Sequence, residues 1–110
     1  MSLPHARSAE AIDIGPLGSR LALEKSSALF KSEQLEVIRL VLPAGRSLPP
    51  HHVQGEITLQ CLEGVIDVTL EGCSHLLRAG QMMFLPAGIH HGIVAVEDAS
   101  ALLTIVLSGQ

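Results

Sequence analysis

Residues 80–91 read G-Q-M-M-F-L-P-A-G-I-H-H, which is a short apolar run followed by a turn signal and two histidines. This order predicts a strand, a tight turn and the start of a returning strand. Pro86 restricts its own φ angle and Gly88 can adopt a positive one, so few turn geometries are available. Because side chains alternate along a strand, we expect His90 and His91 on opposite faces. One of these histidines must then point into the core that the strands enclose.

The chain from residue 28 onward has the pattern of short strands between turn signals. Turn signals that recur about every 8–12 residues are typical of all-β sandwiches and barrels. We therefore predict an all-β fold with strands at residues 28–31, 35–42, 52–62, 65–70, 73–78, 81–85, 89–96 and 101–107.

The first part of the chain differs from this pattern. Residues 1–18 contain two prolines and two glycines and predict an irregular arm. We expect one or two helical turns over residues 19–25, with Ser19 as the N-cap. The expected organisation is an N-terminal arm over residues 1–27 and a β-barrel over residues 28–110.

The composition limits the classes of function. A chain of 110 residues forms one domain, and its formal net charge of −4, without a basic run, argues against nucleic acid as a partner. No apolar stretch reaches the ~20 residues of a membrane span, and the N-terminus has no apolar signal core. The two cysteines form no disulfide framework. We therefore expect a cytoplasmic protein with both thiols free.

Aromatic residues make up only 2% of the chain, whereas hydrophobic residues as a whole make up 47%. The core must therefore consist of Leu, Ile, Val and Ala side chains. A site that grips sugars by stacking on aromatic rings is hard to assemble from this composition.

Some strands are apolar on both faces, as in the nearly continuous apolar run over residues 102–107. An antiparallel sheet normally keeps one face polar and solvated. The outer face must then be covered, either by the N-terminal arm or by a second subunit. Because a symmetric dimer is the commonest oligomer, we expect a homodimer.

The spacing around the histidine turn, G-x5-P-x-G-x2-H, resembles the second sequence motif of the cupin family. Gly80, Pro86, Gly88 and His91 occupy the motif positions, and His91 stands in the place of the family's last metal ligand. The final Asn of that motif is replaced by Ala95. The resemblance implies a cupin-like double-stranded β-helix, which is a jelly-roll barrel, and cupins are commonly dimeric.

The stretch upstream matches the family's first motif, G-x5-H-x-H-x3-E-x6-G, only in part. Gly45, His51 and Gly64 stand at the motif positions. Val53 replaces the second histidine and Ile57 replaces the glutamate. The resemblance as a whole covers residues 35–107, with the second motif nearly complete and the first motif half kept.

The register of this upstream strand decides which side chains face the barrel interior. In the register of the motif, His51 and His91 meet inside an aliphatic lining that contains no carboxylate. A β-bulge at Gly55 would instead turn Glu56 inward and give two histidines and one carboxylate, a set suited to non-haem iron or a similar ion. A complete slip would form a polar pocket from the opposite set, His52, Gln54, Glu56 and Gln60. We favour the motif register because all the matched residues agree with it.

Three classes of function remain open. The first, which we favour, is a module that binds a small molecule, with a divalent metal (Fe, Mn, Ni or Zn) held weakly at His51 and His91. The second is a metal-dependent oxygenase or isomerase with His51, His91 and Glu56 as metal ligands. The third is a metal-free vestigial cupin that acts as a dimeric protein-interaction module. Two imidazoles are fewer than the three or four protein ligands that hold a first-row metal firmly, which favours the first class over the second.

Overall fold

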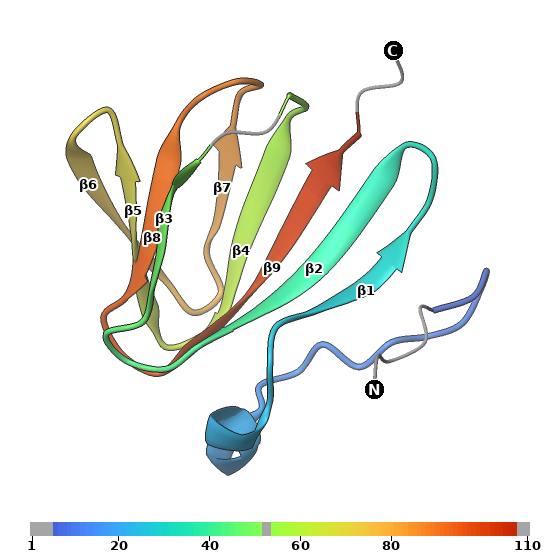
Figure 1. Cartoon of the computed structure of the whole chain (residues 1–110). Helices are drawn as coiled ribbons and strands as arrows, with labels where there is room; N and C mark the ends of the chain where they lie inside the picture. Colours follow the sequence, from blue (N-terminus) through green and yellow to red (C-terminus); the bar gives the residue numbers. More distant parts are fainter. Residues whose placement is uncertain (1–5, 52–53, 108–110) are drawn as a thin grey trace.

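The computed structural model describes residues 6–51 and 54–107, except for the side chains of residues 49–51. These residues form one short 3₁₀ helix and a series of β-strands (Figure 1). In chain order the elements are η1 (Gly18–Leu23), β1 (Ser27–Lys31), β2 (Leu35–Leu42), β3 (Ser47–His51), β4 (Ile57–Glu63), β5 (Val65–Leu70), β6 (Cys73–Arg78), β7 (Met82–Leu85), β8 (His91–Ala95) and β9 (Ala99–Val106).

The strands lie in two sheets that face each other (Figure 1). One sheet has five strands in the order β1-β2-β9-β4-β7, and the other has four in the order β3-β8-β5-β6. All neighbouring strands are antiparallel. Several neighbours are far apart in the sequence, as when β2 pairs along its whole length with β9. The chain therefore crosses repeatedly between the sheets, and the predicted all-β jelly roll is confirmed.

Three of the predicted strands have the predicted bounds, namely β2, β5 and β6. The strand predicted over residues 52–62 is confirmed from Ile57 onward, as β4, but its start was wrong, because residues 54–56 contain a bend and no strand. β3 was not predicted, because it contains Pro49 and Pro50, which lack a backbone N–H group. A strand with prolines is possible here because β3 lies at the edge of its sheet.

The core lies between the two sheets and is aliphatic, as the composition predicts. Cys61 is buried and Cys73 is exposed, and both thiols are free. Phe84 is 57% exposed and lies outside the core. The largest fully buried side chains include Leu42, Leu59, Ile66 and Leu85.

The N-terminal arm covers part of the outer face of the five-stranded sheet, beside β1 and β2 (Figure 1). Val37 and Val41 of β2 point away from the core and are nevertheless buried, as is Leu21 of η1. The Ser26 hydroxyl accepts a hydrogen bond from the Val41 N–H at 2.8 Å. The arm therefore supplies one part of the apolar cover that the strand pattern requires.

The helical turns expected in the arm are the 3₁₀ helix η1. Its N-cap residue is Leu17, which makes no side-chain capping hydrogen bond, so the expected cap at Ser19 was wrong. In the part of the chain that the structure describes, no helix is long and apolar enough to cross a membrane.

Candidate functional site

The turn between β7 and β8 sends its two histidines to opposite sides, as the sequence predicts. Gly88 has a φ angle of 79°, a conformation that glycine adopts without strain. His90 is exposed, whereas His91 is only 1% exposed. His91 is therefore the inward-facing member of the pair.

His91 lies on the core side of β8. It shares one face of the strand with Ile93 and Ala95, which belong to the hydrophobic core. Its ring Nδ1 is 3.4 Å from the carbonyl oxygen of Ile89, and its Nε2 is buried. Of the buried polar residues that the structure describes, His91 is the one on the core side, and the others are Arg39 and Ser100.

The backbone brings the His51 position beside His91. β3 is the neighbour of β8, and its register places His51 directly opposite His91. The ladder is irregular between Leu48 and His51. Positions directly opposite each other in antiparallel strands share one face of the sheet. The His51 position therefore lies on the same face of the sheet as His91. The structure describes the backbone of His51 and not its side chain.

Glu56 is exposed and precedes β4, so the structure does not bring its side chain to His91. From the next residue onward, alternate side chains of β4 are buried, at 3%, 0% and 0% exposure for Ile57, Leu59 and Cys61. This alternation agrees with the register of the cupin motif, in which Ile57, Leu59 and Cys61 face the interior. It does not agree with the complete slip, which would turn Glu56 and Gln60 inward. His52 and Val53 lie outside the described residues.

The family resemblance implies a metal ion, and the described side chains do not fit a three-ligand centre. Among them, no group of three or more His, Cys, Asp and Glu residues could hold a metal ion. Of the three candidate ligands, only His91 has a side chain that is both described and directed inward. A firmly held first-row metal takes three or four protein ligands, and among the described side chains His91 is the one candidate ligand that faces inward.

A second polar cluster, which sequence reasoning missed, lies under the N-terminal arm. Arg39 of β2 is 8% exposed, and its Nη2 atom is 3.8 Å from the Glu63 carboxylate. The Ser100 hydroxyl donates a hydrogen bond to the same carboxylate. The backbone N–H groups of Leu17 and Gly18 also donate to Glu63, at distances between 2.9 and 3.1 Å. Glu63 therefore joins the arm to the outer face of the sheet.

The hydrogen bonds at Glu63 change its acidity. Burial alone would raise the pKa of the Glu63 carboxyl group. Hydrogen bonds from Leu17, Ser100 and Gly18, together with the Arg39 charge, outweigh this effect and lower the pKa below its ordinary value of 4.5. The carboxylate is therefore the form that the folded protein stabilises.

The sequence does contain a signal for this cluster. Arg39 is the only charged residue in V-I-R-L-V-L, residues 37–42. Alternation along the strand places it on the outer face together with two valines, opposite the core residues Leu40 and Leu42. An outer face that carries valines beside a single arginine indicates a covered face, and this pattern could have located the cluster.

The two sheets and the inward histidine at the β7–β8 turn define a small jelly-roll domain with one candidate site in its interior. The cupin domain family matches residues 38–108, well over half of the chain, and the protein belongs to this family. No curated protein matches the sequence.

Several solved structures share the fold. A cupin superfamily protein from Desulfitobacterium hafniense has a TM-score of 0.76 at 19% identity, covering 94% of this chain and 100% of that chain. A conserved protein of unknown function from Streptococcus pyogenes has a TM-score of 0.75 at 23% identity, covering 98% and 96%. An RmlC-like cupin from Desulfovibrio desulfuricans has a TM-score of 0.70 at 23% identity, covering 93% and 97%. At these identities the likeness shows the fold alone.

Proposed function

We propose that this cupin binds a small molecule in the barrel interior, beside His91. The observation that supports the proposal is the burial of the imidazole on the core side of β8, at 1% exposure. Burying a polar ring in an aliphatic core costs desolvation free energy. A core that needed only to be stable would be served better by an aliphatic side chain at this position. A role in ligand binding explains why an imidazole is present.

The surroundings of His91 indicate what kind of ligand would fit. The nearest side chains on the same face of the sheet are aliphatic: Leu70 of β5 lies directly opposite His91, and Val68 and Ile93 form the next pair. Such a lining favours an apolar molecule that carries one polar group for the imidazole to orient. A metal held at His91 and at the His51 position would have two imidazoles, so weak binding is expected.

The experiment compares His91→Ala with His90→Ala, because these adjacent histidines differ in burial. The purified proteins are analysed for Fe, Mn, Ni and Zn, and a library of small compounds is screened by ligand-observed NMR. We expect substoichiometric metal in the unaltered protein and compounds whose binding is lost in His91→Ala but kept in His90→Ala. Far-ultraviolet circular dichroism checks that both variants fold.

Other outcomes would contradict the proposal in different ways. Near-stoichiometric metal that His91→Ala removes would favour the metal-dependent oxygenase or isomerase. Compounds that bind equally to both variants, or no binding compound at all, would contradict a ligand site at His91.

We also propose that the partner of this chain is a second copy of itself. The arm covers the β1–β2 side of the five-stranded sheet, and β4 and β7 lie on the other side (Figure 1). Six residues of β9, β4 and β7 lie side by side on the outer face of the sheet, and none of them is charged. They are Thr58, Gln60, Met82, Phe84, Leu102 and Thr104. In a two-fold symmetric dimer the same patch meets itself, so a patch without charge avoids self-repulsion.

A further inference from the structure

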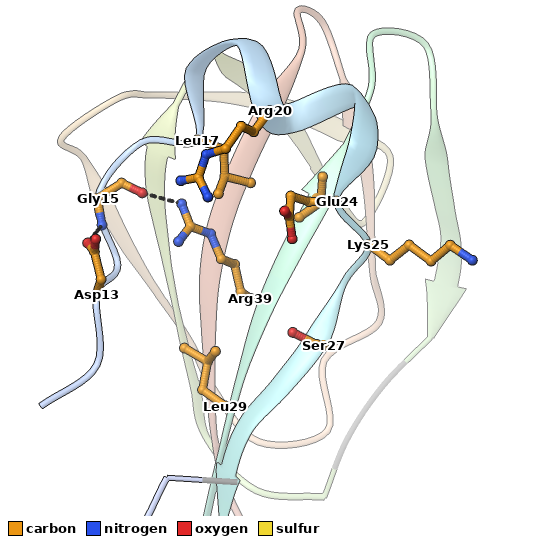
Figure 2. Close-up of a pocket in the computed structure, with 10 residues that line it drawn as sticks. Asp13, Gly15, Leu17, Arg20, Glu24, Lys25, Ser27, Leu29 and Arg39 are labelled. Atoms are coloured by element: carbon orange, nitrogen blue, oxygen red, sulfur yellow. Dashed lines mark hydrogen bonds between the residues drawn. The ribbon is translucent and has the colours of Figure 1, made fainter. Parts of the chain in front are cut away.

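The N-terminal arm and the outer face of β1 and β2 line a pocket of about 220 Å³ (Figure 2). Arg39 forms part of the wall, and it lies on the opposite face of β2 from the core residues Leu40 and Leu42. The pocket is therefore separate from the barrel interior that holds His91. The function proposed above does not use it.

Protein acceptors satisfy only part of the buried Arg39 guanidinium. Its Nη2 atom donates to the carbonyl oxygen of Gly15 at 2.5 Å and to the hydroxyl of Ser100 at 3.4 Å. Its Nε atom is buried and has no hydrogen-bond partner among the described residues. A buried N–H group of a cation that lacks an acceptor is costly. An acceptor from a ligand in the pocket would remove this cost.

A second guanidinium reaches the same pocket. Figure 2 shows the Arg20 side chain pointing from η1 toward Arg39, whereas Lys25, which also lines the pocket, directs the end of its side chain away from both arginines. Both arginines line the pocket. Arginine donors match the geometry of a carboxylate, and hydrogen bonds between charged groups are the strong ones.

We propose that this pocket binds a small monocarboxylate with a short aliphatic chain. The carboxylate accepts hydrogen bonds from Arg39 Nε and from Arg20. The aliphatic chain lies against the apolar part of the pocket lining, Leu17, Leu29 and Val41.

The acidic residues of the pocket limit the charge of the ligand. Glu24 and Asp13 also line it, and an Asp13 carboxylate oxygen accepts a hydrogen bond from the Gly15 N–H at 2.9 Å. The pocket lining carries three cationic side chains, Arg20, Lys25 and Arg39, against these two carboxylates, so its formal excess is one positive charge. A single negative charge balances this excess, whereas a multiply charged anion such as phosphate exceeds it.

The test is a titration of ¹⁵N-labelled protein with sodium butyrate, followed through the assigned Nε–Hε resonance of Arg39. We expect a saturable shift with butyrate and none with butylammonium chloride or sodium phosphate at the same ionic strength. Arg20→Ala should raise the Kd for butyrate about tenfold, because a hydrogen bond between charged groups is lost. Arg78→Ala is the matched control and should leave the Kd unchanged, because Arg78 is exposed on β6 in the other sheet.

Three results would overturn the proposal: a linear shift that sodium chloride reproduces, an equal Kd in Arg20→Ala and the unaltered protein, or tighter binding of phosphate than of butyrate. Because Arg20 is exposed, we expect Arg20→Ala to keep the fold. His91→Ala should not change the Kd for butyrate, which separates this site from the barrel interior.

Discussion

Gly55 shows how closely the end of β9 approaches the segment before β4. A Cβ atom at this position would lie 1.6 Å from the carbonyl oxygen of Val106 and 2.8 Å from its carbonyl carbon. Both obstacles are backbone atoms, so no side-chain rotation could make room. The sequence alone allows a β-bulge at Gly55. In the structure, the missing side chain of Gly55 permits this close approach of two backbone segments.

We expect Gly55→Ala to lower the free energy of unfolding by roughly 1–3 kcal/mol or more, because an added carbon overpacks the site. Gly15→Ala is the matched control, since a Cβ atom there would meet only a side-chain oxygen of Asp13, at 3.2 Å. Urea unfolding of both variants measures the difference. Equal stability of the two variants would contradict the close approach at Gly55.

At the residue scale, the sequence could predict which histidine is buried but could not predict the buried arginine. Alternation after a restricted turn is a local rule that placed His90 and His91 on opposite faces, and the resemblance to the second cupin motif indicated that His91 is the inward one. Arg39 is buried because residues far away in the chain, Gly15 and Glu63, surround it. No local rule predicts that the arm folds back over this strand.

At the scale of elements, the structure identifies the contact that joins the arm to the sheet. Glu63 at the end of β4 accepts hydrogen bonds from the arm at Leu17 and Gly18 and from Ser100 of β9. Its side chain is 15% exposed, so these bonds are largely shielded from water. The same bonds lower its pKa, which links the attachment of the arm to pH.

We expect Glu63→Gln to lower the free energy of unfolding by about 1–3 kcal/mol at neutral pH, because hydrogen bonds to a charged group are weakened. The lowered pKa means that the carboxylate contributes stability above the ordinary value of 4.5. This contribution disappears as the pH falls from there through the folded-state pKa, because the unfolded chain takes up the proton first. Chemical unfolding between pH 3 and pH 7 measures the effect.

Glu33→Gln, at an exposed position between β1 and β2, controls for the loss of one negative charge. If the stability difference between Glu63→Gln and the unaltered protein stays constant from neutral pH to below 4.5, the role assigned to the carboxylate is wrong.

Elements with strong local signals could be predicted, and elements defined by long-range pairing could not. β5 and β6 lie on either side of a Glu71-Gly72 turn, and both have the predicted bounds. β3 contains two prolines and is a strand because β8 pairs with it. The candidate site depends on that pairing, so the motif indicated which histidines to consider, while the topology brings the His51 and His91 positions together.

At the scale of the whole molecule, the outer face of β4 and β7 is an apolar surface that the arm does not cover (Figure 1). Met82 and Phe84 are 62% and 57% exposed on the edge strand of the five-stranded sheet. Their cross-strand neighbours on β4 are Gln60 and Thr58, which are uncharged. Exposed apolar surface next to uncharged polar groups is typical of protein interfaces. This is the surface through which we propose that two copies associate.

We expect the unaltered protein to have twice its monomer mass of 11.6 kDa by multi-angle light scattering. Phe84→Glu should produce monomers, because in a symmetric dimer the new charges would face each other across the same patch. Leu76→Glu is the matched control, since Leu76 is also apolar and 45% exposed but belongs to β6 in the other sheet. A dimer that survives Phe84→Glu would exclude this face, and an unaltered protein that is monomeric at micromolar concentration would exclude the homodimer. If Leu76→Glu alone dissociates the dimer, the four-stranded sheet carries the interface and Met82 and Phe84 have another role.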